Sequence, residues 1–248
     1  MKHTMGKNPG LIRPPVKWAG GKSQLITQFI HLFPKRVEYL VEPFMGGGAV
    51  FFHLQPQQAI LSDSNAELIN FYQVLRDDLD SLLVDLRRHK NTAEYYYKIR
   101  ATDPETLTSV QRASRFLYLN KTAYNGLWRV NRKGRHNVPF GRYKNPRIID
   151  EDNLFGAHRL LQRAGIMLAD FSAVLEVARR GMFVYLDPPY YPLSETSGFT
   201  SYTADSFSEN DQYRLAEVFR QLDRTGCLIM LSNSDNQLIR ELYKGYDI

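Results

Sequence analysis

Several residue types and segments that define other protein classes are missing from this sequence of 248 residues. One cysteine, Cys227, excludes a disulfide framework and a cluster of thiolate metal ligands, and we expect it in the core. The six histidines show no ligand spacing, so we expect no metal. No apolar run approaches the roughly 20 residues that cross a bilayer, and the N-terminus lacks the apolar segment of a signal peptide. We therefore expect a cytoplasmic protein with no membrane partner.

Acidic residues are missing from one long stretch. From Arg112 to Arg147 there are ten Lys or Arg residues and no Asp or Glu. The net charge of the chain is +6, so the residues outside this stretch sum to −4. A basic block of this kind is typical of a protein that binds a polyanion, whereas a solvated helix face usually mixes the two signs.

Short apolar runs alternate with helical patterns, which predicts an α/β fold. We expect strands at 39–41, 59–63, 165–170, 182–186 and 227–231. Helices are expected at 66–75, with Asp63 or Ser64 as the cap, and at 213–222, after a capping box from Ser208 to Asp211. The residues between the second and third strands, about 100 in number, are mostly helical in pattern.

A glycine-rich turn follows the first predicted strand, in Glu42-Pro43-Phe44-Met45-Gly46-Gly47-Gly48. Glycines let the backbone approach a ligand, and Asp63 at the end of the next strand suits hydrogen bonds from ribose hydroxyls. A dinucleotide fingerprint requires glycine where Phe51 stands. A nucleoside with a compact charged tail, such as S-adenosylmethionine, fits better. A tight turn with a helix-capping acid would give the same pattern.

The segment Lys17-Trp18-Ala19-Gly20-Gly21-Lys22-Ser23 ends like a phosphate-binding P-loop. Val16 stands where that motif requires glycine and no strand precedes it, which excludes an NTPase. Trp18, beside glycines and between two lysines, instead suits a contact with a ligand and its carboxylate.

The apolar run 182–186 ends in Asp187-Pro188-Pro189-Tyr190. The two prolines stiffen a turn at the carboxyl end of the strand. Asp187 and the Pro188 carbonyl would accept the two hydrogens of an amino group on a planar base, and Tyr190 would stack on its ring. A proline-stiffened loop that only closes a strand fits the same residues. These residues alone do not distinguish adenine from cytosine.

Together these segments resemble the Dam family of DNA adenine-N6 methyltransferases, whose usual target is GATC. The resemblance extends from Pro15 to about Tyr243, and the segments follow the family's order. They are KWAGGK (17–22), VEPFMGGGAVF (41–51), ILSDSN (60–65), FLYLNKTAYNGLWRVN (116–131), NVPFGRYKNP (137–146), DF (170–171), YLDPPY (185–190) and LSNSD (231–235).

The resemblance implies a Rossmann-like methyltransferase domain at 1–63 and 164–248. It also implies a helical target-recognition domain with a β-hairpin at 64–163. S-adenosylmethionine would be the methyl donor, with no metal. The resemblance assigns catalysis to Asp187, Pro188, Pro189 and Tyr190. It assigns cofactor binding to Trp18, Lys22, Phe44, Gly46, Asp63 (ribose), Asp170 and Phe171 (adenine), and Asp187.

Double-stranded DNA would be the partner, bound by a monomer in a bacterial cell or a phage-infected host. Arg129 would contact a guanine, Pro139 would lie by the thymine methyl, and Tyr124 would enter the space left by a flipped adenine. The complete DNA-binding set that the resemblance implies is Lys17, Tyr124, Asn125, Leu127, Arg129, Asn131, Pro139, Arg142 and Tyr143.

Two features depart from the family pattern. Trp128 and Val130 flank Arg129 where Dam enzymes often carry a different residue and a tyrosine. The family also usually continues through a final hairpin beyond the position of Ile248, where this sequence ends. Two alternatives stay open: an N4-cytosine methyltransferase, and a DNA-binding relative that has lost catalysis. Cytosine-C5 chemistry is excluded, because Cys227 follows Gly226 and not a proline.

Overall fold

The computed structural model describes residues 12–18, 20, 22, 26–191 and 207–248. Within them one sheet contains β1 (Tyr39–Glu42), β2 (Gln58–Asp63), β3 (Ala164–Leu168), β4 (Phe183–Leu186) and β5 (Leu228–Leu231). The spatial order is β3-β2-β1-β4-β5, and every neighbouring pair is parallel. The predicted Rossmann-like α/β fold is confirmed. Each predicted strand is found, displaced at its ends by at most two residues.

Leu40 and Val41 of β1 and the whole of β4 are apolar, because both faces of the sheet are buried at these residues. Leu40 packs into a core on one side of the sheet, and the next residue, Val41, packs into a second core on the other side. In β4, Phe183 and Tyr185 face the first core, whereas Val184 and Leu186 face the second. This double burial is typical of parallel sheets covered by helices on both faces.

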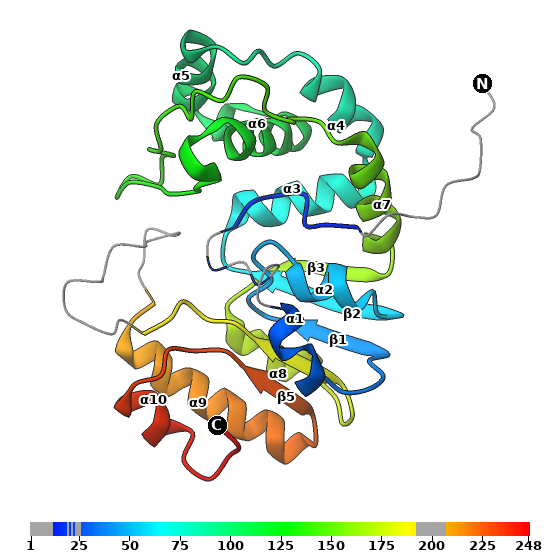
Figure 1. Cartoon of the computed structure of the whole chain (residues 1–248), viewed down its shortest axis with the longest axis vertical. Coiled ribbons are helices and arrows are strands. Elements are labelled where there is room, and N and C mark those ends of the chain that lie inside the picture. Colours follow the sequence, from blue (N-terminus) through cyan, green and yellow to red (C-terminus); the bar gives the residue numbers. More distant parts are fainter. Residues whose placement is uncertain (1–11, 19, 21, 23–25, 192–206) are drawn as a thin grey trace.

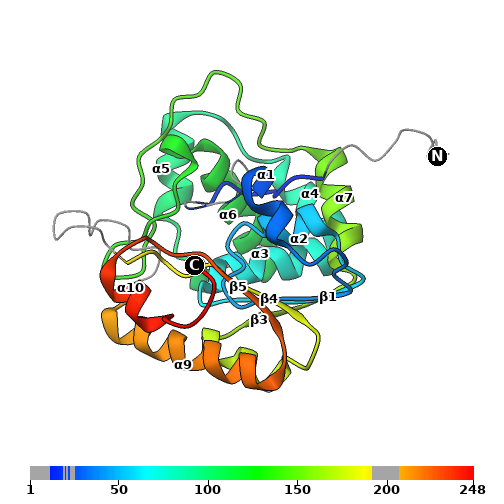
Figure 2. The ribbon, with the colours of Figure 1, turned by 60° about the horizontal axis from the view of Figure 1, so that its bottom comes forward.

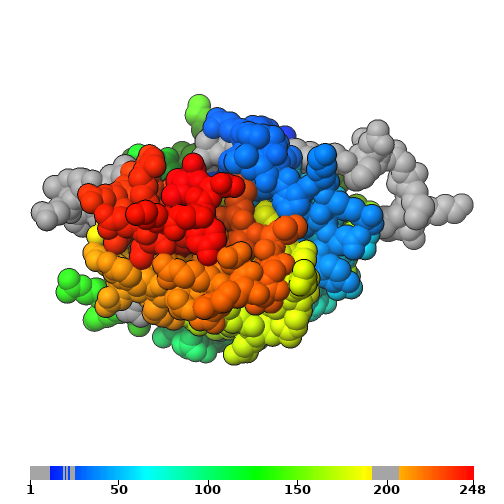
Figure 3. Space-filling view, turned by 90° about the horizontal axis from the view of Figure 1, so that it is seen from below, coloured from blue at the N-terminus to red at the C-terminus, as the bar shows by residue number. Residues whose placement is uncertain are grey.

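Helices cover both faces of the sheet (Figures 1 and 2). The first core is covered by α2 (Ala49–Leu54), α3 (Ala66–Asp77) and α7 (Glu151–Leu161). The second is covered by α8 (Val174–Val177), α9 (Glu209–Thr225) and α10 (Gln237–Leu242). Figure 3 shows α9 and α10, in orange and red, side by side on the lower surface. The short helix α1 (Ile26–Phe29) continues into a 3-10 turn, η2 (Ile30–Leu32), before β1.

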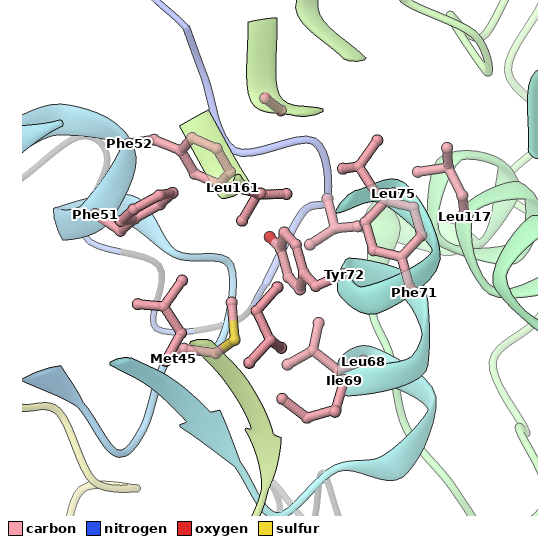
Figure 4. Packing of buried hydrophobic residues seen from close by; sticks show 14 of the residues in the cluster. Met45, Phe51, Phe52, Leu68, Ile69, Phe71, Tyr72, Leu75, Leu117 and Leu161 are labelled. Atoms are coloured by element: carbon pink, nitrogen blue, oxygen red, sulfur yellow. The ribbon is translucent and has the colours of Figure 1, made fainter. Parts of the chain in front are cut away.

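The segment between β2 and β3 forms the upper part of the molecule (Figure 1). After α3 it contains α4 (Leu79–Leu86), α5 (Ala93–Ala101), a 3-10 turn η3 (Pro104–Thr106) and α6 (Ser109–Thr122). A second 3-10 turn, η4 (Tyr124–Gly126), and an irregular segment lead to α7. Packing is continuous from the sheet into this segment. Tyr72 and Phe71 of α3 lie between Met45, which follows β1, and Leu117, which belongs to α6 (Figure 4).

The predicted cap of the helix after β2 is wrong. Asn65 caps α3, and its Oδ1 accepts a hydrogen bond from the Leu68 N–H at 3.0 Å. Asp63 stabilises the turn that precedes the helix, because its carboxylate accepts a hydrogen bond from the Asn65 N–H at 2.9 Å. The predicted capping box of Ser208 and Asp211 is present at the start of α9. Cys227 is buried in the second core, as predicted.

Candidate functional site

The order of the strands reverses between β1 and β4, which are neighbours at the centre of the sheet. Ligands of open α/β sheets bind at the carboxyl ends of strands beside such a reversal. Both strands end there in an acid followed by proline: β1 ends in Glu42-Pro43, and β4 is followed by Asp187-Pro188. Two carboxyl groups are therefore brought to one edge by strands that are distant in sequence.

Asp187 is largely buried and forms an ion pair with Lys22, with 2.7 Å between Oδ1 and Nζ. The Lys22 ammonium also donates to the Gly20 carbonyl at 2.9 Å and lies 4.7 Å from the centre of the Tyr190 ring. Burial raises the pKa of the Asp187 carboxyl, and the nearby lysine opposes that rise. Burial lowers the pKa of Lys22, but Asp187 and Tyr190 together more than offset this and leave it above its ordinary value.

The turn after β4 is held by hydrogen bonds from α9 and from the segment after β5. Gln212, only 1% exposed, donates to the Pro189 carbonyl at 3.3 Å. Asn233 Nδ2 donates to the Gln212 side chain at 2.9 Å, and Asn233 Oδ1 accepts the Tyr191 N–H at 3.3 Å. Pro188 is buried, whereas the Tyr190 side chain is 48% exposed and accessible for stacking. The structure therefore presents the carboxylate and the ring that the sequence predicts.

Glu42 is a second buried carboxyl group at this edge, and the sequence interpretation assigned it no role. It is 2% exposed, and burial raises its pKa to about 8, with a further contribution from the charge of Asp187. A hydrogen bond from the Phe51 backbone lowers the pKa of Glu42, but by less than burial raises it. The sequence does contain a signal that could have identified Glu42. An acid followed by proline stands at the ends of two buried strands, as Glu42-Pro43 and as Asp187-Pro188.

The glycine turn is packed against Trp18. Gly46 has a φ of 47° and Gly48 a φ of 70°, in the left-handed region that favours glycine. A Cβ atom on Gly46 would lie 2.7 Å from Cδ1 of the Trp18 indole. Asp63 Oδ2 accepts the Gly46 N–H at 3.0 Å, so the acid also fixes this turn. Burial raises the pKa of Asp63, against the effect of its backbone donors.

Three aromatic rings gather beside this turn. The Phe44 and Phe171 rings are stacked with centroids 5.4 Å apart, and Phe207 lies 5.9 Å from Phe44 and 5.7 Å from Phe171. The Arg214 guanidinium lies 4.7 Å from the Phe171 ring centre and forms an ion pair with Asp170 at 2.8 Å. The predicted residues Phe44, Asp170 and Phe171 are thus brought together. The sequence interpretation missed Phe207 and Arg214, whose distance along the chain left no local signal.

The N-terminal segment and the turn after α6 are tied together by Asn120, which is fully buried. Its Oδ1 accepts the Lys17 N–H at 2.9 Å, and its Nδ2 donates to the Lys17 carbonyl at 2.7 Å and to the Gly126 carbonyl at 3.2 Å. Tyr124 at the start of this turn is 54% exposed, and Asn125 has a φ of 54°. Lys17 and the predicted DNA-contacting turn therefore form one unit.

A short hairpin follows this turn. Val130 and His136 form an antiparallel bridge, and the Asn131 side chain accepts the N–H groups of Lys133 at 2.9 Å and Arg135 at 3.1 Å. Leu127 and Arg129 are exposed on it. The remaining predicted DNA-binding residues lie close by: the Pro139 carbonyl accepts the Tyr124 N–H at 2.9 Å, Tyr143 lies 5.3 Å from the Lys17 ammonium, and Arg142 is exposed.

A family model described as D12 class N6 adenine-specific DNA methyltransferase matches residues 18–248. The chain belongs to this family. It is 45% identical to the Type II methyltransferase M1.LlaDCHI of Lactococcus lactis subsp. cremoris, over 98% of this chain and 88% of that protein. It is 42% identical to the Type II methyltransferase M.MjaIII of Methanocaldococcus jannaschii, over 96% and 90%. It is 35% identical to the DNA adenine methylase of Haemophilus influenzae, over 94% and 83%.

The family match confirms the resemblance that the sequence predicted. The family is adenine-specific, which favours adenine over cytosine as the target of this methyltransferase. In the part of the chain that the structure describes, no cluster of His, Cys, Asp or Glu side chains has the arrangement of a metal site. No described helix is long and apolar enough to cross a membrane.

The structure divides the basic stretch of this methyltransferase into two groups. Arg112 pairs with Glu67 and Arg147 with Asp150, while Arg115 is buried and donates to the carbonyls of Ile99 and Arg100. Arg135 lies 4.0 Å from Asp103. The other six form no ion pair with any described residue: Lys121, Arg129, Arg132, Lys133, Arg142 and Lys144. Five of these six are exposed and can meet a polyanion, whereas Lys121 is half-buried and burial lowers its pKa to about 8.

Proposed function

We propose that this methyltransferase transfers a methyl group from S-adenosylmethionine to N6 of adenine in double-stranded DNA, within GATC, after flipping the adenine out of the helix. The main supporting observation is that Asp187 and Tyr190 lie at the same strand reversal as the glycine turn and the aromatic cluster. One edge of the sheet thus offers a site for an amino group next to a site for a nucleoside.

The residues beside the glycine turn fit S-adenosylmethionine. Gly46 carries no side chain, so the turn packs closely against Trp18, whose ring would line the site. Asp63 offers a carboxylate beside the turn, and Phe44 and Phe171 offer flat apolar surfaces. Trp18, Lys22 and Asp170 would complete the site. When bound, S-adenosylmethionine supplies an electrophilic methyl group on a sulfonium centre.

Asp187 and the turn after it would activate the target nitrogen. The Asp187 carboxylate and the Pro188 carbonyl would accept its two hydrogens, which draws the nitrogen toward tetrahedral geometry and frees its lone pair for attack. The nitrogen would become positively charged as the bond to the methyl carbon forms and the bond from that carbon to sulfur breaks. A fixed carboxylate would stabilise this charge until one N6 proton is lost to solvent. The Lys22 ammonium favours the ionised form of Asp187 despite its burial. No covalent intermediate with the protein is required.

Base flipping supplies the adenine to this turn. Extrusion of a base costs a few kcal/mol, and stacking on the exposed Tyr190 ring returns about 1–3 kcal/mol. Tyr124, exposed at the start of its turn, would fill the space left in the duplex. Asn125, Leu127, Arg129, Pro139 and Lys17 would contact bases, while Asn131, Arg142 and Tyr143 would complete the DNA surface.

The proposal of GATC as the target rests on the segments that resemble the Dam family, which include Lys17, Arg129 and Pro139. Because both parts of the site belong to one chain, we propose that the enzyme acts as a monomer. The bacterial and phage relatives support action on DNA in the cytoplasm of a bacterium or a phage-infected host.

Methylation of a plasmid tests the proposal directly. We expect the treated plasmid to resist a GATC-cutting enzyme that methyladenine blocks and to become sensitive to one that requires methyladenine. Mass analysis of nucleosides should show N6-methyladenine, and N4-methylcytosine would contradict the proposed target. Calorimetric titration should detect S-adenosylmethionine binding. No binding at millimolar cofactor would instead favour a DNA-binding relative that has lost catalysis.

A further inference from the structure

The side chain of Arg129 is held in place by Asn137 across the hairpin. Arg129 Nε donates to Asn137 Oδ1 at 2.8 Å, and the Asn137 N–H donates to the Arg129 carbonyl at 3.0 Å. Arg129 is exposed, and among the residues that the structure describes it has no carboxylate partner. The only side chain that orients this guanidinium in the described structure is therefore a neutral amide.

The geometry of this bond leaves the base-reading edge of the guanidinium available. Arginine has five N–H donors in a planar fork, and a bidentate contact with guanine O6 and N7 uses two of them. The bond to Asn137 occupies Nε, so the terminal nitrogens remain available. A bond at Nε also fixes the plane of the fork, since the group is rigid. A carboxylate at position 137 would partly neutralise the charge, whereas an amide does not.

The backbone positions of Arg129 and Asn137 are fixed by buried neighbouring residues. Trp128 precedes Arg129 and is 3% exposed, and His136 precedes Asn137 and is 5% exposed. Their rings lie 4.7 Å apart, and Trp128 also packs on Phe116 of α6 at 4.4 Å. The hairpin therefore presents Arg129 and Asn137 from fixed backbone positions. Trp128, a departure from the Dam pattern, gains a structural explanation as this anchor.

We propose that Asn137 is a positioning residue that sets the orientation of Arg129 for reading a guanine. The inference rests on the proposed function, because it assumes that Arg129 contacts a base. Without the Asn137 side chain the Arg129 guanidinium would be free to rotate. It would then contact the correct guanine and a wrong base more equally. The effect belongs to discrimination at one base pair and not to overall affinity for DNA.

The test compares kcat/KM for a GATC duplex and for duplexes changed at each position in turn, using the full chain. The variants are Asn137→Ala, Arg129→Ala and the double variant. We expect Arg129→Ala to lose about 10- to 100-fold of discrimination at one base pair, and Asn137→Ala to lose about 5-fold or more at the same pair. The double variant should lose no more than Arg129→Ala, because both changes remove one interaction.

Two further variants separate orientation from charge and from general damage. Asn137→Asp keeps an acceptor for Nε and adds a negative charge, so it should weaken binding to all duplexes while retaining discrimination. Asn145→Ala removes an exposed asparagine of the same basic stretch and should leave discrimination unchanged. Thermal unfolding checks that every variant is folded.

The outcomes distinguish this inference from the proposed function. Unchanged discrimination in Arg129→Ala would overturn the guanine contact and, with it, the role of Asn137. Loss in Arg129→Ala with none in Asn137→Ala would overturn the role of Asn137 alone. Equal weakening of all duplexes by Asn137→Ala would identify a phosphate contact and also overturn it.

Discussion

The two charged groups on which the proposed function depends, Asp187 and Arg129, are held in opposite ways. Asp187 is largely buried and is paired with a full opposite charge on Lys22. Arg129 is exposed and is paired with the neutral amide of Asn137. Both contacts have nearly the same length, 2.7 Å and 2.8 Å, so the difference lies in charge and surroundings.

Burial explains the difference. An unpaired carboxylate in a site of low polarity would take up a proton, so Asp187 needs a cation beside it to remain an anion. Arg129 is exposed, so water already solvates its guanidinium. It needs only a fixed direction, which a neutral acceptor provides without reducing its attraction to DNA. The partner of the buried Asp187 therefore controls its protonation, whereas the partner of the exposed Arg129 controls its orientation.

The largest expected effect is on the buried side. Asp187→Ala should lower the rate of methyl transfer by about 100- to 1000-fold, because it removes the carboxylate that stabilises the developing charge. DNA affinity should stay close to the wild-type value. Single-turnover methylation and equilibrium DNA binding measure the two effects. A folded variant that loses both equally would show that Asp187 does not act in the chemical step.

Gly46→Ala should reduce stability near the same site. A left-handed backbone costs an alanine about 1–2 kcal/mol, and overpacking against Trp18 adds about 1–3 kcal/mol. Urea denaturation measures the loss. Gly134→Ala is a matched control, because Gly134 has a φ of 70° but nothing within 4 Å of a new Cβ atom. Equal losses in the two variants would remove the contact with Trp18 from the explanation.

On the exposed side, Arg129→Ala should cost about 1–3 kcal/mol of discrimination at a single guanine. Competition between duplexes that differ at one base pair measures it. The effect should persist when the salt concentration is raised, since a bidentate base contact is specific. Uniform weakening that grows smaller in high salt would instead assign Arg129 to a phosphate.

The smallest effect concerns protonation of Glu42, whose pKa is raised from 4.5 to about 8 in the folded protein. The protonated carboxyl stabilises the fold fully below its ordinary pKa, and this contribution is lost as the pH rises through about 8. Between about pH 7 and about pH 8 the loss is about 1 kcal/mol. Glu42→Gln should flatten the unfolding free energy over this interval. Parallel pH profiles for wild type and variant would contradict a protonated Glu42.

The sequence predicted features that depend on neighbouring residues. The strand ends, the glycine turn and the Asp187-Pro188-Pro189-Tyr190 turn are local patterns, and the structure contains each of them. The cap of α3 was misplaced because Asp63, Ser64 and Asn65 are all good capping residues, and only the backbone geometry selects Asn65.

Other features depend on contacts between distant segments and could not be predicted. Asn120 binds Lys17 across 103 positions of the chain, and Arg214 binds Asp170 across 44. Neither pairing follows from periodicity or composition. The basic stretch was also only partly understood, because Arg112, Arg115 and Arg147 stabilise the fold in ways that charge counting does not distinguish from DNA contacts.

The contact of Lys22 with both Asp187 and Tyr190 has a consequence for how a base would enter. The ammonium lies against one oxygen of the Asp187 carboxylate and near the Tyr190 ring, which the target amino group and base would also contact. An incoming adenine would therefore meet a carboxylate that already has a cation beside it. We expect Lys22 to act as an internal counterion that keeps Asp187 ionised before a base enters.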